Sequence, residues 1–433
     1  MTKVEYLNKL QEKLQKFSDD LQTEIMDDYM QHFAEGEQLG KSEEEIIAEL
    51  GNIEDMIRDL PEDEMVQQNE SSLAEIVEAE SNRQNSYDGN CSEIVIDGSV
   101  ADVIVTESED GRIYVDYRND GDLDCQLKYE FYLYEENGVF YAGVRRREGV
   151  GGANRKTISF FGKTISFENM FERDSSEDIT LDVKVPAGMG KIVAKTGSGD
   201  MKVYALRAVA TVFSTGSGEL TVRDVEVNNF KLNTGSGDVS LEKGKFESAV
   251  LNTGSGEIEL NMVETDKLNG NTASGDVCMK NIYAGTLKFN TASGDVDMSY
   301  MDAGSMSFNS ASGDISGNRI TVQDSVSCTT ASGDVDMEGC ARSFKFGSAS
   351  GDLSVHCGGN LQSVSASTAS GDVDMTLEGI TGMEITSKAG SGDVEIDWQG
   401  QDSCVKNATS TFGDGSCKVL VKTGSGDISV VCR

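Results

Sequence analysis

Apolar and polar residues alternate through most of this chain, and from Thr196 onward the alternation follows a five-residue phrase that recurs twelve times. The phrase reads Thr-Gly-Ser-Gly-Asp at Thr196–Asp200 and Thr-Ala-Ser-Gly-Asp at Thr291–Asp295. Its acidic positions are Asp200, Glu219, Asp238, Glu257, Asp276, Asp295, Asp314, Asp334, Asp352, Asp372, Asp393 and Asp427. The first six steps between them are 19 residues each, and a fixed period of this size indicates a repeat architecture.

The residues around each acid predict strands with one buried face. The position after the acid is apolar in every copy, and the position two further on is apolar in all copies except the one with Gly317. Another alternating run precedes the phrase, as in Leu287-x-Phe289-x-Thr291. Alternation of period two is typical of half-buried strands. We therefore predict a mainly β fold, a single-chain β-solenoid of about twelve 19-residue coils. Each strand would pair with its equivalent in the next coil, about 4.8 Å away.

The phrase predicts the corner between two strands. Its serine and second glycine occur in all twelve copies, and glycine permits a positive φ and a tight turn that a Cβ would obstruct. Stacked threonines such as Thr196 and Thr215 would form a ladder of hydroxyl groups. The acid column has two explanations: its carboxylates accept hydrogen bonds from turn amides, or they bind calcium. Calcium-binding repeats carry G-G-x-G-x-D about every nine residues, and this chain does not, which favours the first explanation.

Residues 1–61 have helical periodicity instead. Leu7, Leu10, Leu14 and Phe17 are spaced by three or four, and so are Leu21, Ile25, Tyr29 and Phe33. The expected capping residues are Thr2 with Glu5, Ser42 with Glu45, Gly40 and Gly51 at helix C-termini, and Asn52 before a last helix that reaches Leu60. We predict a small N-terminal bundle of three or four short helices.

The rest of the chain divides by composition. Residues 62–90 are polar and acidic, which predicts a solvated linker. Residues 91–190 contain longer alternating runs and the hairpin signal Asn137-Gly138, and we predict that they open and cap the solenoid of residues 191–433. The period breaks between Asp393 and Asp427, where either a degenerate coil or a loop covering the last edge would fit.

Composition limits the partners and the location. The chain has 75 acidic and 37 basic residues, a net charge of −38, which disfavours nucleic acid and anionic membranes as partners. No run of 18 apolar residues predicts a membrane-spanning helix. The first thirty residues are charged throughout, unlike a secretory signal. Nine cysteines without a C-x-x-C motif are typical of reduced thiols. We expect a cytoplasmic protein.

The catalytic candidates are few. Only His32 and His356 could act as imidazole bases, and both fall where a structural role is expected. Cys328 and Cys340 occupy apolar columns, where a thiol acts as a small hydrophobic group. The paired carboxylates Asp295 with Asp297 and Asp372 with Asp374 would lie on an outer strand face, and no pair differs from the others as a glycosidase pair would.

Two further motifs have simpler explanations. Gly162-Lys163-Thr164 is similar to the end of a phosphate-binding Walker A loop, but Thr157 stands where its first glycine is needed, so a hairpin turn is expected. Arg145-Arg146-Arg147 could grip an anion, but neighbouring acids such as Glu148 favour a solvated strand end. We predict no catalytic, cofactor-binding or metal site, and therefore no enzyme and no cofactor.

The N-terminal sixty residues resemble the bacterial HAAS signalling domain. The residues that carry the resemblance are Met1-Thr-Lys-Val-Glu-Tyr-Leu7, Asp28-Tyr29, His32-Phe33-Ala-Glu-Gly36 and Lys41-Ser42-Glu-Glu-Glu-Ile-Ile-Ala-Glu-Leu50-Gly51. Asn52-Ile53 departs from the Asp-Pro that the family usually has. The resemblance implies a helical module that is often fused to membrane segments, absent from this sequence, and commonly encoded beside PadR-type transcription regulators.

From Ile94 to its end the chain resembles the bacterial putative-adhesin domain of β-strand repeats, a domain of unknown function. The resemblance rests on Leu181-x-Val-x-Val-Pro186 and on the serial turns. Our first hypothesis is a non-enzymatic interaction or scaffold protein whose rigid acidic solenoid binds a protein partner, while the helices engage a PadR-type regulator or a second copy. The alternatives are a surface or secreted adhesin, which would need export without a visible signal, and a carbohydrate-acting enzyme.

Overall fold

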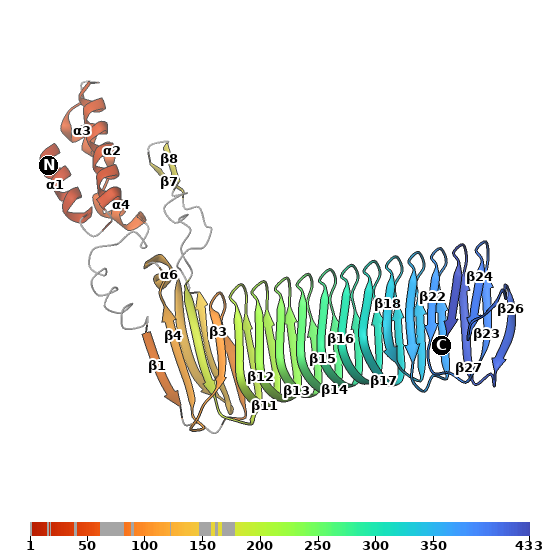
Figure 1. Cartoon of the computed structure of the whole chain (residues 1–433). Coiled ribbons are helices and arrows are strands. Elements are labelled where there is room, and N and C mark those ends of the chain that lie inside the picture. The colour runs from red at the N-terminus through yellow and green to blue at the C-terminus, as the bar shows by residue number, and fades with distance from the viewer. Residues whose placement is uncertain are drawn as a thin grey trace. The chain divides into compact units, whose positions relative to one another are not determined.

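The computed structural model describes residues 2–14, 17, 19–38, 41–60, 82–87, 91–121, 123–146, 157–160, 163–166 and 178–433. The chain divides into a helical unit, Met1–Ser81, and a β unit, Asn82–Arg433 (Figure 1). Most of the expected linker, together with Gly40 and Pro61, lies outside the described residues. Residues 82–87 of that linker form a strand, β1 (Asn82–Tyr87), whose polar sequence gives no alternation by which to predict it.

The helical unit contains α1 (Lys3–Leu14), α2 (Asp19–Gln38), α3 (Glu43–Leu50) and α4 (Ile53–Asp59). Six residues of the predicted stripes are buried, namely Leu10, Leu14, Phe17, Leu21, Tyr29 and Phe33, whereas Leu7 and Ile25 are only partly buried. Tyr6, which the stripes did not include, is also buried. Both capping boxes are present, as are the Gly51 C-cap and the Asn52 N-cap. No described helix has the length and apolar character needed to cross a membrane.

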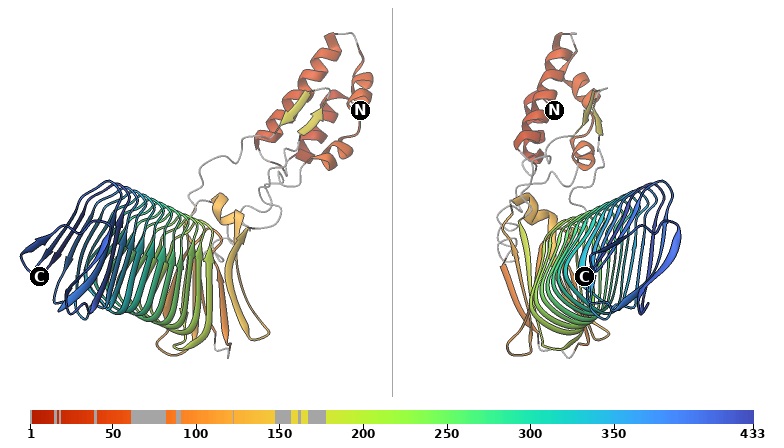
Figure 2. Two further views of the ribbon diagram at one scale, coloured as in Figure 1. Left: turned by 90° about the vertical axis from the view of Figure 1, so that its right-hand side faces the viewer. Right: turned by 45° about the vertical axis from the view of Figure 1, so that its right-hand side comes forward.

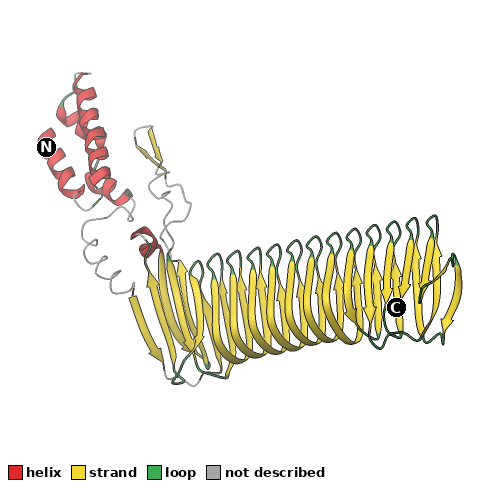
Figure 3. Ribbon diagram, viewed as in Figure 1, coloured by secondary structure: helices red, strands yellow, loops and turns green. Residues whose placement is uncertain are grey.

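The middle of the β unit is a stack of coils, each made of one long strand. These strands are β11 (Met201–Thr215), β12 (Leu220–Thr234), β13 (Val239–Asn252), β14 (Ile258–Asn271), β15 (Val277–Asn290), β16 (Val296–Asn309) and β17 (Ile315–Thr329). Each pairs in parallel and in register with the next, so the predicted solenoid is confirmed. The strands bend around the core without a break, and in Figure 3 the loops lie at the opposite edge.

The bend has a backbone signature that the sequence did not reveal. The fifth residue after the acid has φ between 48° and 58° in seven successive coils. These residues are Ala205, Asp224, Lys243, Met262, Asn281, Tyr300 and Arg319. The predicted apolar columns are buried, as Met201 and Val203 illustrate. A further inward column lies eight residues after the acid, where Val227 and Phe246 are buried.

The backbone conformation and the hydrogen bonds of the turn phrase differ from our expectation. Its glycines do not have positive φ. The second glycine is required because successive coils approach closely: a Cβ on Gly275 would lie 1.8 Å from the carbonyl oxygen of Gly256. The threonines form no ladder among themselves, since the Thr291 hydroxyl accepts the Gly294 N–H at 3.0 Å, as its equivalents do in other coils. A side-chain ladder is formed instead by asparagines in successive coils, namely Asn233, Asn252, Asn271, Asn290 and Asn309.

The N-terminal end of the β unit is built from shorter strands. They are β2 (Glu93–Asp97), β3 (Asp102–Glu107), β4 (Ile113–Asn119), β5 (Tyr129–Glu136), β6 (Val139–Arg146), β9 (Ile179–Val185) and β10 (Met189–Thr196), with a short helix α6 (Leu123–Lys128). One face of the stack continues through β3, β9, β4 and β1, and the other through β10, β2, β6 and β5. The Asn137-Gly138 hairpin joins β5 to β6, both residues with positive φ, as predicted. We call this region the N-terminal cap.

The C-terminal end departs from chain order. Its strands are β18 (Val335–Cys340), β19 (Ser343–Gly347), β20 (Leu353–Gly358), β21 (Ser363–Ser367), β22 (Val373–Leu377), β23 (Gly382–Ala389), β24 (Val394–Trp398), β25 (Gln401–Ser403), β26 (Ala408–Gly413), β27 (Cys417–Thr423) and β28 (Ile428–Cys432). The last coil, β27 with β28, lies between the coil of β21 and β22 and the coil of β23 and β24. The expectation that every coil stacks on its successor is therefore wrong here.

The coil of β23 and β24 forms the end of the stack, and two antiparallel strands cover its edge. Antiparallel β26 and β25 pair with the outer edges of β23 and β24, and Trp398 stacks on Phe412 with ring centroids 5.7 Å apart. The period break is thus an edge cover, one of the two arrangements expected from the sequence. Figure 2 shows the coils of the β unit stacked between its two different ends.

Candidate functional site

The acid column forms hydrogen bonds along the stack. The Oδ1 atom of an aspartate accepts the backbone N–H of the acid in the neighbouring coil, and ten such bonds among the described residues measure 2.7–2.9 Å. Asp102, in the N-terminal cap, supplies the first of them. Among the described residues, Glu219 and Glu257 do not accept such a bond, because the longer side chain misplaces the carboxylate. The aspartates of the column therefore have a structural role: they link neighbouring coils.

Within the described residues, no group of three or more His, Cys, Asp or Glu side chains is arranged to hold a metal ion. Asp297 accepts a hydrogen bond from Ser316, and Asp295 accepts the N–H of Asp314 at 2.8 Å. Asp372 and Asp374 are exposed on the outer face of their strand, as expected.

The histidines and cysteines are dispersed. His356 lies on β20 with its Nε2 3.1 Å from Glu378 Oε1, and His32 lies partly exposed on α2. Cys328 is fully buried, and burial raises the pKa of its thiol to about 12. Cys340 is exposed, contrary to our expectation, because the register shifts where β18 pairs with β17 and places Gly339 opposite Ile320.

The structure describes part of the Gly162-Lys163-Thr164 motif and part of the Arg145-Arg146-Arg147 motif. Lys163 and Thr164 lie in β8 (Lys163–Ser166), which pairs antiparallel with β7 (Thr157–Phe160), so the expected hairpin is present. Gly162 and Arg147 lie outside the described residues. Arg145 donates to Glu130 on β5 at 2.6 Å and lies over the Tyr132 ring.

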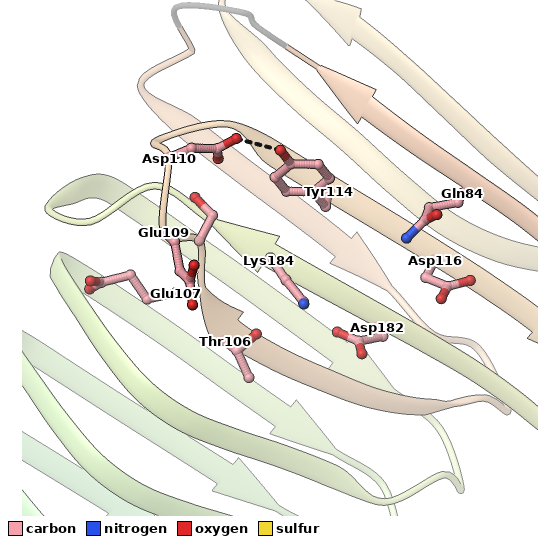
Figure 4. A pocket seen from close by; sticks show the side chains of 10 residues that line it. Gln84, Thr106, Glu107, Glu109, Asp110, Tyr114, Asp116, Asp182 and Lys184 are labelled. Atoms are coloured by element: carbon pink, nitrogen blue, oxygen red, sulfur yellow. Dashed lines mark hydrogen bonds between the residues drawn. The ribbon is translucent and has the colours of Figure 1, made fainter.

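A hollow of about 410 Å³ in the N-terminal cap brings several polar side chains together (Figure 4). The strands β1, β3, β4 and β9 line it, together with the loop that follows β3. The lining residues are Gln84, Thr106, Glu107, Ser108, Glu109, Asp110, Tyr114, Asp116, Asp182 and Lys184. Tyr114 donates its hydroxyl to Asp110. Glu107 is paired with Arg207, whose guanidinium lowers the pKa of the Glu107 carboxyl by hydrogen bonding.

Two aspartates lie side by side in this hollow. Asp116 on β4 and Asp182 on β9 are directly opposite in an antiparallel pair, where like charges are destabilising. Burial raises the pKa of the Asp182 carboxyl; Lys184 and Arg118 lower it, and Asp116 raises it. Among the described residues, neither Asp182 Oδ1 nor the Oγ of the 6 % exposed Ser108 has a hydrogen-bond partner. The hollow can therefore receive a hydrogen-bond donor.

Asp182→Asn is predicted to stabilise the β unit at pH 7 by about 0.5–1 kcal/mol, the size of a repulsive cross-strand pair. The raised native pKa means that ionised Asp182 costs stability above that pKa, and the cost disappears as the pH falls and the carboxyl is protonated. Urea midpoints at pH 7 and near pH 4 would test this. The gain should shrink at the lower pH, and Asp336→Asn, at an exposed position on β18, should change neither midpoint. Destabilisation at pH 7 would contradict the prediction.

The sequence did not point to this hollow. Asp116 and Asp182 are 66 positions apart, and only the antiparallel pairing of β4 with β9 brings them together. Each is a polar residue in an alternating run, which is also the pattern of an ordinary outer strand face. A polar residue at that position gives no sign of which strand will lie beside it.

Comparisons with known proteins agree with the two-part organisation. The Toastrack DUF4097 family model matches residues 91–309 and 263–431, and the HAAS model matches residues 5–68. No curated protein matches the chain.

Solved structures share little sequence with the chain. A putative cell adhesion protein from Clostridium sporogenes ATCC 15579 is 11% identical, covering 81% of this chain and 100% of that chain, with a TM-score of 0.15. A putative lipid binding protein from Parabacteroides distasonis ATCC 8503 is 14% identical over 80% and 96%, with a TM-score of 0.23. A putative adhesin from Bacteroides fragilis NCTC 9343 is 12% identical over 81% and 96%, with a TM-score of 0.21. We draw nothing from likeness at these TM-scores.

Proposed function

Because the chain belongs to the Toastrack DUF4097 family over residues 91–309 and 263–431 and has a HAAS domain at residues 5–68, we propose that it is a non-enzymatic interaction protein. The HAAS unit would engage a regulator, and the solenoid would present an acidic surface to a protein partner. One observation carries the proposal. Successive coils are hydrogen-bonded through the turn backbone and, where the acid is an aspartate, through the acid column, so the outward side chains are held about 4.8 Å apart on a rigid support.

A PadR-type regulator is the partner we propose for the HAAS unit. Among the described helical residues, Met30 on α2 is a large apolar side chain that stays 44% exposed. We expect the purified full chain to bind the purified PadR-type regulator of the same bacterium, and Met30→Glu to weaken binding at least tenfold. Gln11→Glu, which adds the same charge at an exposed position on α1, is the matched control. Failure of the full chain to bind, or equal loss in both variants, would overturn this assignment.

We further propose that the chain acts inside the cell. Its net charge of −38 and its reduced cysteines fit that location. Protease added to intact cells should leave the chain whole, whereas protease added after lysis should cleave it. Cleavage on intact cells would instead favour a surface adhesin.

A further inference from the structure

A groove of about 570 Å³ crosses six coils on the outside of the bend. Its lining residues stand seven, eight and nine places after the acid, so the same three columns form it in every coil. It extends from the coil of Glu226 to the coil of Gln323. We call it the bend groove. Five steps of about 4.8 Å give it a length of about 24 Å along the stack.

Two glycines line the bend groove where other coils carry a longer side chain. At the ninth position after the acid, where an earlier coil has Glu247, later coils have Gly285 and Gly304. A Cβ on Gly285 would lie 2.6 Å from the carbonyl oxygen of Asp266, and one on Gly304 would lie 2.4 Å from that of Gly285. Gly285 and Gly304 therefore leave this part of the groove, its floor, without side chains, and close backbone contacts oppose adding one there.

The sides of the bend groove are acidic and carry one exposed aromatic ring. The acids that line it are Glu226, Glu247, Glu264, Asp266 and Asp302. Against them stands one lysine, Lys245, which lies 3.3 Å from Glu264. Tyr283 is 59% exposed beside the bare floor at Gly285. Carboxylates and an exposed tyrosine ring together attract lysine and arginine side chains, through charge and through cation–π contact.

We propose that the bend groove binds an extended, basic segment of a protein partner, lying along the stack. The inference rests on the proposed function, to which it adds the chemistry of the partner. The charge of the groove repels nucleic acid and acidic segments, and its length matches about seven residues of extended chain at about 3.3 Å each. Alternate side chains of such a segment would face the floor, where small residues leave room for the stem of a lysine or arginine beside Tyr283.

The test measures binding of a fluorescein-labelled ten-residue peptide of alternating lysine and glycine to the full chain by anisotropy. The groove variant carries Glu264→Gln, Asp266→Asn and Asp302→Asn. The control variant carries Glu259→Gln, Asp336→Asn and Asp374→Asn, which remove the same charge from exposed positions outside the groove. We expect at least a tenfold loss of affinity in the groove variant and less than a threefold loss in the control. Tyr283→Ala should lose affinity without any change of charge.

The outcomes separate this inference from the proposed function. Equal losses in both triple variants, or a Tyr283→Ala variant that binds as the parent does, would show diffuse attraction to an acidic protein and would overturn the groove assignment. The groove assignment is also overturned if the peptide fails to bind while the PadR-type regulator binds. In that case the proposed function stands. If neither binds, both fail.

Discussion

Gly275→Ala is expected to destabilise the β unit by at least about 3 kcal/mol, the upper end of the cost of overpacking, although it adds one methyl group. The new Cβ would lie 1.8 Å from the carbonyl oxygen of Gly256 and 2.5 Å from its carbonyl carbon. Both atoms belong to backbone that the neighbouring coils hold in place, so no flexible side chain can move aside. Urea unfolding followed by circular dichroism would measure the loss.

The first glycine of the same phrase provides the matched control. A Cβ on Gly254 would lie 2.3 Å from the carbonyl oxygen of Gly235, yet alanine already stands at the equivalent place in later coils, as Ala273 and Ala292. We expect Gly254→Ala to lose less than half as much stability as Gly275→Ala. Equal losses would mean that any added methyl group in the turn is harmful, and that the approach of the second glycine is not special.

The sequence predicted the coil because each coil repeats the same local pattern. Met201 and Val203 are buried where alternation placed them, and parallel stacking follows from equal spacing. Local capping chemistry was equally readable: Ser42 with Glu45 caps α3, and Asn137-Gly138 turns between β5 and β6. Such features depend on residues close together in the chain, so a single sequence contains them.

Features that depend on contacts between neighbouring coils could not be predicted from the sequence. The need for Gly275 arises from the position of Gly256 in the coil below, and the hollow in the N-terminal cap arises from the pairing of Asp116 with Asp182. The bend groove is similar, since its floor becomes bare only where Gly285 stacks with Gly304. The order of the last coils could not be read from the sequence either, because the turn phrase is nearly the same in each coil and does not indicate which coil lies beside it.

Removing only residues 428–433 is expected to destabilise the β unit by about 6 kcal/mol, although the ends of a chain usually tolerate truncation. The deletion removes β28, which pairs on one side with β22 and on the other with β24. Ile428, Val430 and Cys432 are at most 2% exposed, and burying each such side chain contributes about 2 kcal/mol. Hydrogen exchange should become faster in β22 and β24 together, because both lose their shared neighbour.

The outward residues of the same strand give the control for this truncation. Ser429→Ala and Val431→Thr alter side chains on the partly exposed face of β28 and should leave exchange in β22 and β24 slow. A truncated chain that keeps the parent's stability would mean that the coil of β23 and β24 docks directly on β22. The docking surfaces would then be interchangeable, and the inserted position of the last coil would not contribute to stability. Fast exchange in β28 of the intact chain would contradict its position between two coils.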